Sequence, residues 1–282
     1  MALKDLLVHV DTTPRSATRT ELAARLAIQH NAHLTGLHVI DIPSANYFYG
    51  AAMPFVPTNP EEIVDRIRAE AVEAARPIEA AFRECLRRNG IEGEWRMVEG
   101  SPPATVALHA RYADLAIVGQ PNRDEPRDAD AVTVTTIMTS GRPVLAVPFA
   151  GDFPTVGERV LVAWNASREA ARALNDALPL LLNAKQVTVL AINPQRGVGG
   201  HGDVPAADIA LHLARQGLKT EAAHTVAKDI ADGEALLSYA ADIGADLIVA
   251  GAYGHSRARE MVFGGVTRTL IAEMTAPVLF SH

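Results

Sequence analysis

Short, continuous runs of apolar residues recur along the chain and alternate with longer segments in which apolar residues return every three or four positions. The runs include LLVHV near the start, LAIVG from Leu115 and LIVAG from Leu247, and none alternates strictly between apolar and polar residues. A strand that is buried on both faces has this continuous pattern, whereas a half-exposed strand alternates. The runs therefore predict a parallel sheet that is covered on both faces.

The segments between the runs have the periodicity of amphipathic helices. SATRTELAARLAIQH from Ser16 and SREAARALNDALPLL from Ser167 both space their apolar residues by three and four, which places those residues on one face of a helix. Short, right-handed connections between parallel strands put such helices on both faces of the sheet. The alternation predicts a doubly wound α/β fold.

A third helix is predicted to be longer than the others and to follow Asn59. That asparagine is a candidate N-cap, Pro60 suits the first helical turn, and Gly90 is a candidate stop. Pro77 lies inside the segment and is expected to kink or break the helix, because proline removes a backbone donor.

The whole pattern occurs twice along the chain, as an internal repeat. LLVHVDTTPRS near the start resembles VLVAWNASREA from Val160, which aligns Asp11 with Asn165. HLTGLHVID parallels QVTVLAINP, ADLAIVGQ parallels ADLIVAGA, and each copy closes on a short run after proline, RPVLAVP and APVLFSH. Four matches in the same order predict two tandem Rossmann-like domains, 1–150 and 157–282, each with a five-stranded parallel sheet flanked by helices. The connecting segment 149–159 is short, so the two halves are expected to pack together.

Charge and size narrow the class of protein. The chain has 282 residues with 26 Lys and Arg against 33 Asp and Glu, a net charge of −7. This balance favours neither nucleic acid nor an anionic membrane as partner. No segment has the roughly 18 apolar residues of a membrane span and none has the features of a signal peptide, so a cytoplasmic protein is expected. The single cysteine, Cys85, is interpreted as a helix residue without a catalytic role.

The segment GAYGHSRAREMVFGGVT, Gly251 to Thr267, follows one of the buried runs. Ligands of doubly wound sheets bind at the carboxyl ends of the strands, where the strand order reverses. Glycine lets a ligand approach the backbone, and the start of the next helix offers free amides and the positive end of the helix dipole. We therefore expect the amides of Gly264 and Gly265 and the Thr267 hydroxyl to donate to phosphate. The spacing is neither a Walker P-loop nor a dinucleotide fingerprint.

The spacing of these glycines does resemble a known motif. Gly251-x-x-Gly254, nine further residues, and then Gly264 followed by Gly265 are similar to the G-x2-G-x9-G-(S/T) nucleotide motif of the universal stress protein family. The duplicated unit that closes on PVL fits that family as well. The resemblance covers almost the whole chain and implies a tandem member with an adenine nucleotide alpha hydrolase-like fold.

Carried over position by position, the resemblance implies one nucleotide site, in the second half. The residues implied at the phosphate and ribose are Gly251, Gly254, Gly264, Gly265 and Val266, with Thr267 close by. The family's aspartate at the end of the first strand falls on Asn165, and the adenine would meet the backbone near Ala191 and Ile192. The implied ligand is ATP or another adenine nucleotide, and the resemblance leaves open whether Mg²⁺ accompanies it.

The two halves depart from the family pattern in complementary ways. The second half has lost the charged acceptor at Asn165 and has Gly265 where ATP-binding members have Ser or Thr, and both departures count against ATP as the nucleotide. The first half keeps Asp11 but has Asn122 and Asp130 near the positions of the glycines. Acidic residues there would repel phosphate, so the first half is interpreted as a degenerate copy.

No catalytic residue and no metal site are expected from the sequence. None of the nucleophile motifs occurs, and a metal-binding carboxylate near the glycine-rich loop is not apparent. The histidines at 30, 33 and 38 lie near Asp41 in sequence, but they fall on a helix end and a strand, so they are interpreted as solvated or capping residues.

The leading hypothesis is a tandem universal stress protein that binds an adenine nucleotide and responds in stress adaptation through an unidentified protein partner, with at most weak ATP hydrolysis. One alternative is a weak ATPase or an adenylate-forming enzyme. Another is a scaffold or apolar-ligand binder that uses the aromatic insertion 43–60. In the resembled family the final strands exchange across a dimer. A tandem chain can satisfy that contact internally as a pseudo-dimer, and whether it also forms a homodimer is left open.

Overall fold

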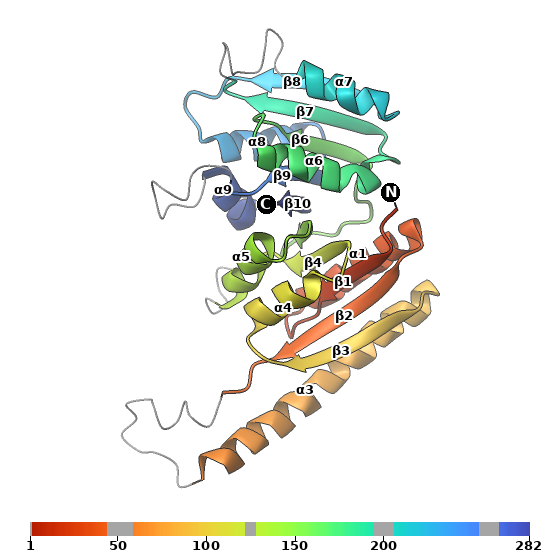
Figure 1. Cartoon of the computed structure of the whole chain (residues 1–282), viewed down its shortest axis with the longest axis vertical. Helices are drawn as coiled ribbons and strands as arrows, with labels where there is room; N and C mark the ends of the chain where they lie inside the picture. The colour runs from red at the N-terminus through yellow and green to blue at the C-terminus, as the bar shows by residue number, and fades with distance from the viewer. Residues whose placement is uncertain (1, 44–58, 122–127, 195–205, 254–264) are drawn as a thin grey trace.

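The computed structural model describes residues 2–43, 59–121, 128–194, 206–253 and 265–282 (Figure 1). The strands are β1 (Asp5–His9), β2 (His33–Ile40), β3 (Gly93–Glu99), β4 (Leu115–Gly119), β5 (Val144–Val147), β6 (Arg159–Ala163), β7 (Gln186–Ile192), β8 (Thr220–Thr225), β9 (Leu247–Gly251) and β10 (Val278–Ser281). The helices are α1 (Arg15–His30), α3 (Pro60–Asn89), α4 (Pro102–Ala110), α5 (Asp128–Thr139), α6 (Arg168–Leu181), α7 (Ala207–Arg215), α8 (Asp232–Asp242) and α9 (Gly265–Glu273).

The strands form one ten-stranded sheet in the order β3-β2-β1-β4-β5-β10-β9-β6-β7-β8. Each half of the chain contributes five parallel strands, as the sequence predicts. The two halves join where β5 pairs antiparallel with β10, with Leu145 opposite Leu279. The final strands of the two copies would be exposed edges in separate domains. Here each supplies the backbone hydrogen-bond partners of the other at the centre of the molecule (Figure 1).

Two apolar cores lie on opposite faces of the sheet. One core packs residues of α1, α3, α6 and α7 against the strands. The other core packs residues of α4, α5, α8 and α9 against the opposite face. Because both faces are covered, the inner strands bury nearly every residue, as in β4 and β9, whose first four residues are all buried, whereas the edge strands β3 and β8 have no buried residue. The continuous apolar runs of the sequence follow from this double burial.

Local signals in the sequence explain where several helices begin and end. The Ser167 side chain caps α6 by accepting a hydrogen bond from the Ala170 amide at 3.1 Å. The long helix α3 follows Asn59 and ends at Gly90, whose left-handed conformation suits glycine.

Of the two outcomes expected at Pro77, a kink or a break, the break does not occur, because the helix runs without interruption from Pro60 to Asn89. Proline removes one hydrogen bond to the carbonyl four residues earlier, that of Glu73. Pro77 and Glu73 are both exposed, so water can satisfy the carbonyl that lost its donor. The packing of Phe82, Cys85 and Leu86 on the sheet then holds the helix together.

The segment between the halves is tied to both of them. Arg25 of α1 donates a hydrogen bond to the Phe153 carbonyl at 2.7 Å. The Asp246 carboxylate accepts from the amides of Gly157, Glu158 and Arg159 at 2.9 to 3.1 Å. These contacts agree with the expectation that the halves pack together.

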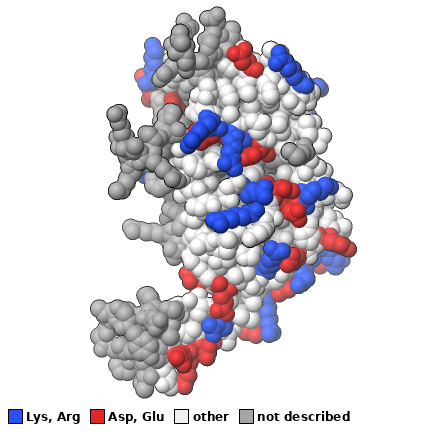
Figure 2. Space-filling view, viewed as in Figure 1, with Lys and Arg blue, Asp and Glu red and all other residues white. Residues whose placement is uncertain are grey.

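Acidic and basic side chains are interspersed over the face that Figure 2 shows. This distribution agrees with the mixed composition and the small negative net charge of the sequence. No helix among the described residues is long and apolar enough to cross a lipid bilayer.

Candidate functional site

Each half of the sheet has one point at which the strand order reverses. In the first half it lies between the neighbours β1 and β4, and in the second between β6 and β9. Helices leave such a pair of strands toward opposite faces, which opens a crevice at the carboxyl ends. The residues that follow these four strands are therefore the candidates for ligand binding.

In the second half the structure brings three predicted residues to this edge. Asn165 follows β6 and is exposed, Ile192 is the last residue of β7, and Gly251 is the last residue of β9. The Asn165 Oδ1 accepts a hydrogen bond from the Ser167 amide at 3.1 Å. Its side chain thus closes the turn before α6, and its Nδ2 donates to none of the residues that the structure describes.

Gly251 has a packing role that the sequence analysis did not foresee. A Cβ at this position would lie 2.5 Å from both the Ala170 nitrogen and the Glu169 carbonyl carbon. The first turn of α6 therefore crosses the end of β9 at a distance that only glycine permits. This close approach accounts for Gly251 whether or not a ligand binds beside it.

The predicted residues at the start of α9 differ in their surroundings. Gly265, the first residue of the helix, is exposed, and a Cβ there would meet no atom of the described residues within 4 Å. Val266 packs against the core on its side of the sheet. Thr267 is buried, and its Oγ1 accepts a hydrogen bond from the Tyr253 amide at 3.4 Å. The Thr267 hydroxyl thus ties α9 to the exit of β9 and keeps its own hydrogen to donate.

Some of the predicted positions lie outside the described residues. These are Gly254 and Gly264 of the glycine-rich loop, Asn122 of the first half, and most of the aromatic insertion, residues 44–58. Asp130 belongs to the first turn of α5.

Tyr253 and His282 form a contact beside the second crevice that sequence reasoning missed. Their rings meet edge to face at 6.4 Å, and His282 Nδ1 lies 3.0 Å from the Ala252 carbonyl oxygen. Burial raises the pKa of Tyr253 to about 12. Tyr253 has a φ of 56°, which is unusual for a residue with a side chain. The chain therefore turns sharply at the point where it leaves β9.

The first half has a hollow of about 200 Å³ at its own crevice, between the ends of β1 and β4. We call it the first-half hollow. Its polar lining includes His9, Asp11, Arg15, Arg19, Gln120 and Thr133. Thr133 of α5 donates to the Gly119 carbonyl at 2.7 Å, which fixes the helix against the end of β4.

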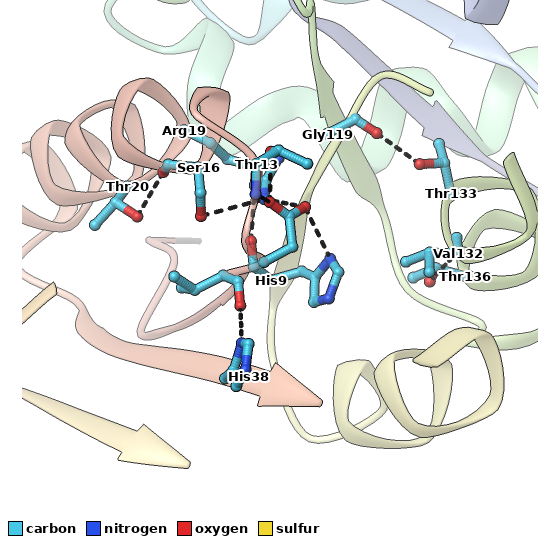
Figure 3. Close-up of polar contacts among 12 residues, drawn as sticks. His9, Thr13, Ser16, Arg19, Thr20, His38, Gly119, Val132, Thr133 and Thr136 are labelled. Carbon is cyan, nitrogen blue, oxygen red and sulfur yellow. Dashed lines mark hydrogen bonds and ion pairs between the residues drawn. The ribbon is translucent and has the colours of Figure 1, made fainter. Parts of the chain in front are cut away.

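The centre of the first-half hollow is an ion pair between Asp11 and Arg19. Arg19 Nη2 lies 2.7 Å from Asp11 Oδ2, and Arg19 Nε donates to the His9 carbonyl at 2.7 Å. The other carboxylate oxygen of Asp11 accepts from the Thr13 amide at 3.0 Å and the Thr13 hydroxyl at 2.5 Å. Figure 3 shows these contacts gathered around Thr13 and Arg19. The carboxylate is therefore held by three residues at once, Arg19, Thr13 and His9.

The protonation states of this cluster follow from burial and charge. Burial lowers the pKa of His9 to about 4, with the Arg19 charge acting in the same direction. Burial would raise the pKa of Asp11, but Arg19, His9 and the Thr13 hydrogen bonds outweigh it and hold the pKa below the usual 3.8. At neutral pH the cluster therefore contains an ionised Asp11 and a neutral His9.

Arg19 was not singled out by the sequence analysis. It is buried, and a Cβ at Gly119 would collide with its Nη1 atom. A signal was available, because Arg19 shares the apolar face of α1 with Leu22, Ala23 and Leu26. A cation in that stripe requires a buried partner. In the second copy the aligned position is Ala173.

A wider groove of about 450 Å³ separates α1 from α3 and includes Ile78, Phe82 and Cys85 in its lining. Burial raises the pKa of the Cys85 thiol to about 11, so the thiol is protonated at neutral pH. His38, one of the histidines considered for a metal, places Nδ1 2.7 Å from the Val10 carbonyl oxygen. No group of three potential metal ligands occurs within the described ranges.

Comparison with known proteins identifies the second half. Residues 157–282 match the sequence model of the universal stress protein family. The second half is a universal stress protein domain. No curated protein sequence matches the chain.

Solved structures extend the similarity in fold to the whole chain. A universal stress protein from Archaeoglobus fulgidus DSM 4304 superposes with a TM-score of 0.68 at 18% identity, over 98% of this chain and 95% of its own. A putative universal stress protein from Pseudomonas aeruginosa UCBPP-PA14 gives 0.57 at 13% identity, over 99% and 93%. Both likenesses span the two halves, so the tandem α/β arrangement itself occurs in structures of universal stress proteins.

Proposed function

We propose that the protein binds an adenine nucleotide at the crevice of its universal stress protein domain and acts in stress adaptation as a nucleotide-responsive module. The observation that carries the proposal is the start of α9. Gly265 is exposed at the first position of this helix, and none of the described residues has an atom within 4 Å of where its Cβ would lie. The resemblance of its loop to the family's nucleotide motif supports the proposal that the phosphates bind at this opening.

The physical argument for phosphate binding is the free end of a helix. The first amides of α9 have no acceptor within the helix, and the helix dipole adds partial positive charge at the same place. The helix belongs to the crevice between β6 and β9, where ligands of this fold class bind. A phosphate at Gly265 would thus meet oriented donors without having to displace a side chain.

The remaining predicted contacts concern the nucleoside. Asn165 retains a free amide group, which can donate to a ribose hydroxyl, and its side-chain oxygen is already used by Ser167. Ile192 closes β7 beside it and offers backbone groups to an adenine edge. A ribose contact by an amide is weaker than one by a carboxylate, so we expect modest affinity.

The proposal assigns no catalytic residue and treats ATP hydrolysis as weak at most. Binding would alter a surface that a protein partner contacts. We propose the cytoplasm as the location and 1–150 as a second, degenerate domain of the same kind. The internal pairing of β5 with β10 already occupies the strands that would otherwise pair between copies.

The test begins with the purified full-length protein. It is denatured, any released small molecule is identified by mass spectrometry, and the emptied protein is titrated with ATP and AMP by calorimetry, with and without Mg²⁺. Adenine nucleotide that co-purifies or binds in the micromolar range is expected. The absence of binding at millimolar nucleotide would overturn the proposal.

A pair of variants at one position localises the site. Gly265→Leu should abolish nucleotide binding, because the side chain would occupy the space beside the first amides of α9. Gly265→Ala, which adds only a methyl group in open space, should bind within a few-fold of the parent. Circular dichroism should show both variants folded. Equal affinity of the leucine variant and the parent would place the nucleotide elsewhere.

A further inference from the structure

The described lining of the first-half hollow carries more positive charge than its own carboxylate neutralises. Among its described lining residues, Arg15 and Arg19 are cationic and Asp11 is anionic. His9 is neutral at physiological pH because its pKa lies at about 4. The described lining therefore has a net positive charge in a protein whose overall charge is −7.

The Asp11 carboxylate is fully engaged by the protein itself. It accepts from the Arg19 guanidinium on one oxygen and from the Thr13 amide and hydroxyl on the other. A carboxylate with three short hydrogen bonds has little capacity left to attract a cation or to repel an anion that binds beyond Arg19. The carboxylate therefore holds Arg19 in place and is not available as a ligand for a cation.

Arg19 has one nitrogen that the protein does not use. The side chain is 3% exposed, and its Nε and Nη2 atoms donate to the His9 carbonyl, the Asp11 carboxylate and the Ser16 hydroxyl. Within the described residues Nη1 donates to none, and it lies against Gly119, where only the absence of a side chain makes room for it. A buried guanidinium with an unused donor in a hollow is an uncommon arrangement, and Figure 3 shows Arg19 between its partners and Gly119.

Arg15 supplies the second cation, one turn earlier on α1. Its Nη2 donates to the Gly151 carbonyl, so the acceptor that it has among the described residues carries no charge. Its Nε atom is buried, and the described residues offer it no hydrogen-bond partner. Two guanidinium groups with unused donors therefore line the same hollow.

We propose that the first-half hollow binds a small oxyanion, a phosphate or a carboxylate group, between Arg15 and Arg19. The planar fork of a guanidinium matches either group. A volume of about 200 Å³ lies below the usual range of sites for drug-sized ligands, so the ligand is a small ion or a compound of few atoms and not a nucleotide. The site is separate from the nucleotide site proposed for the second half, and its aligned copy has Ala173 in place of Arg19.

The experiment compares two arginines of the same helix. Full-length protein is titrated by calorimetry with sodium phosphate and, separately, with sodium acetate, at constant ionic strength in chloride. Arg15→Gln removes a cation from the hollow. Arg25→Gln is the matched control, because Arg25 also lies on α1 and also donates to a carbonyl of the connecting segment, that of Phe153, but lies outside the hollow.

Saturable binding of at least one of the two anions is expected, and the arm that binds identifies phosphate or carboxylate as the preferred group. Arg15→Gln should weaken that binding about tenfold or more, since a hydrogen bond to a charged group is worth at least that factor. Arg25→Gln should leave it unchanged. The proposal is overturned if neither anion binds saturably, or if both variants weaken binding equally.

A second variant addresses the buried arginine directly. Arg19→Lys keeps the charge but has no planar fork and no second donor directed at Gly119. We expect a folded protein with weaker anion binding and with adenine nucleotide affinity unchanged. If the variant bound the anion as tightly as the parent, Arg19 would not belong to the site and the proposal would be contradicted.

Discussion

At the scale of single residues, the two copies use one position in different ways. Asp11 and Asn165 both accept a hydrogen bond from the amide two residues later, which closes the turn before the following helix. Only Asp11 also pairs with a buried cation, because Arg19 has become Ala173 in the second copy. Asp11 is therefore a structural ion-pair partner, whereas Asn165 remains exposed and available to a ligand.

This difference predicts unequal effects of the same substitution. Asp11→Ala leaves the Arg19 charge buried without its carboxylate and should lower the free energy of unfolding by roughly 3 kcal/mol. Asn165→Ala, the matched control, removes one exposed hydrogen bond and should cost less than about 1 kcal/mol. Urea unfolding of both variants measures the difference. If both variants lost the same free energy of unfolding, the ion pair would add no stability to that of the hydrogen bond that closes the turn.

His9 predicts a pH dependence of stability in the same cluster. Its pKa of about 4 in the folded protein lies below the value of 6.5 for an unperturbed histidine, so the unfolded chain takes up the proton first as pH falls. Its contribution is complete above pH 6.5 and decreases toward pH 4, by roughly 3 kcal/mol at 1.4 kcal/mol per pKa unit. Asp11, with its pKa below 3.8, stays ionised through most of this window.

The variant that tests this dependence is His9→Gln. Urea unfolding between pH 4.5 and 7.5 should show a shallower fall of stability for the variant than for the parent. A smaller slope should remain, because burial also lowers the pKa of His30 and of His109. An unchanged slope after the substitution would mean that another group takes up the proton.

At the scale of elements, the glycines at the end of β9 and the start of α9 have different purposes. Gly251 permits α6 to cross the end of β9, where a Cβ would meet Ala170 and Glu169 at 2.5 Å. Gly265 has free space around it at the first turn of α9. In the resembled motif Gly251 is the first glycine and Gly265 stands at the Ser or Thr position, and the packing around the two residues differs as well.

Substitution by alanine should therefore have opposite results at the two positions. Gly251→Ala should lower the free energy of unfolding by about 2 kcal/mol, because α6 must move away from the sheet. Gly265→Ala should be neutral or should stabilise the fold by up to about 1 kcal/mol, since alanine favours the helix more than glycine does. Thermal or urea unfolding distinguishes them. A stable Gly251→Ala variant would contradict the close approach of α6.

At the scale of the whole molecule, the sheet joins the halves into one unit. The ladder between β5 and β10 crosses the centre, and both strands are fully buried. Gln120, which follows β4, adds a second link, because its Nε2 donates to the Ile271 carbonyl of α9 at 3.0 Å and its Oε1 accepts from the Phe149 amide at 3.0 Å. The first-half hollow is thus connected by one side chain to the helix that begins at the proposed nucleotide site.

We expect the chain to unfold in a single cooperative transition. The transition should remain single when the hydrogen bonds of Gln120 are removed. Gln120→Ala leaves the Ile271 carbonyl and the Phe149 amide without their buried partner and should cost about 2 kcal/mol. Thr133→Val, which removes a hydrogen bond within the first half alone, is the matched control and should cost about 1 kcal/mol. Calorimetry that resolved two transitions in the parent would show the halves to be independent.

The predictions from sequence succeeded where a residue acts through its immediate surroundings. The parallel strands flanked by helices and the start and end of α3 at Asn59 and Gly90 are confirmed. Pro77 was misjudged because its cost depends on whether the carbonyl of Glu73 faces solvent, which the sequence of the helix does not state. Arg19 was missed because its partner, Asp11, becomes visible only when α1 folds back on β1.

The sequence by itself determined the duplicated α/β topology, since continuous apolar runs require burial on both faces and helical periodicity supplies the cover. It also placed Asn165, Ile192, Gly251 and Gly265 at one edge, because the carboxyl ends of parallel strands meet there. Only the tertiary structure decided that the two sheets fuse through β5 and β10, that Gly251 serves packing, and that Arg15 and Arg19 line a hollow. These outcomes depend on contacts between segments that lie far apart in the chain. The local pattern of apolar and polar residues does not show which distant segments meet.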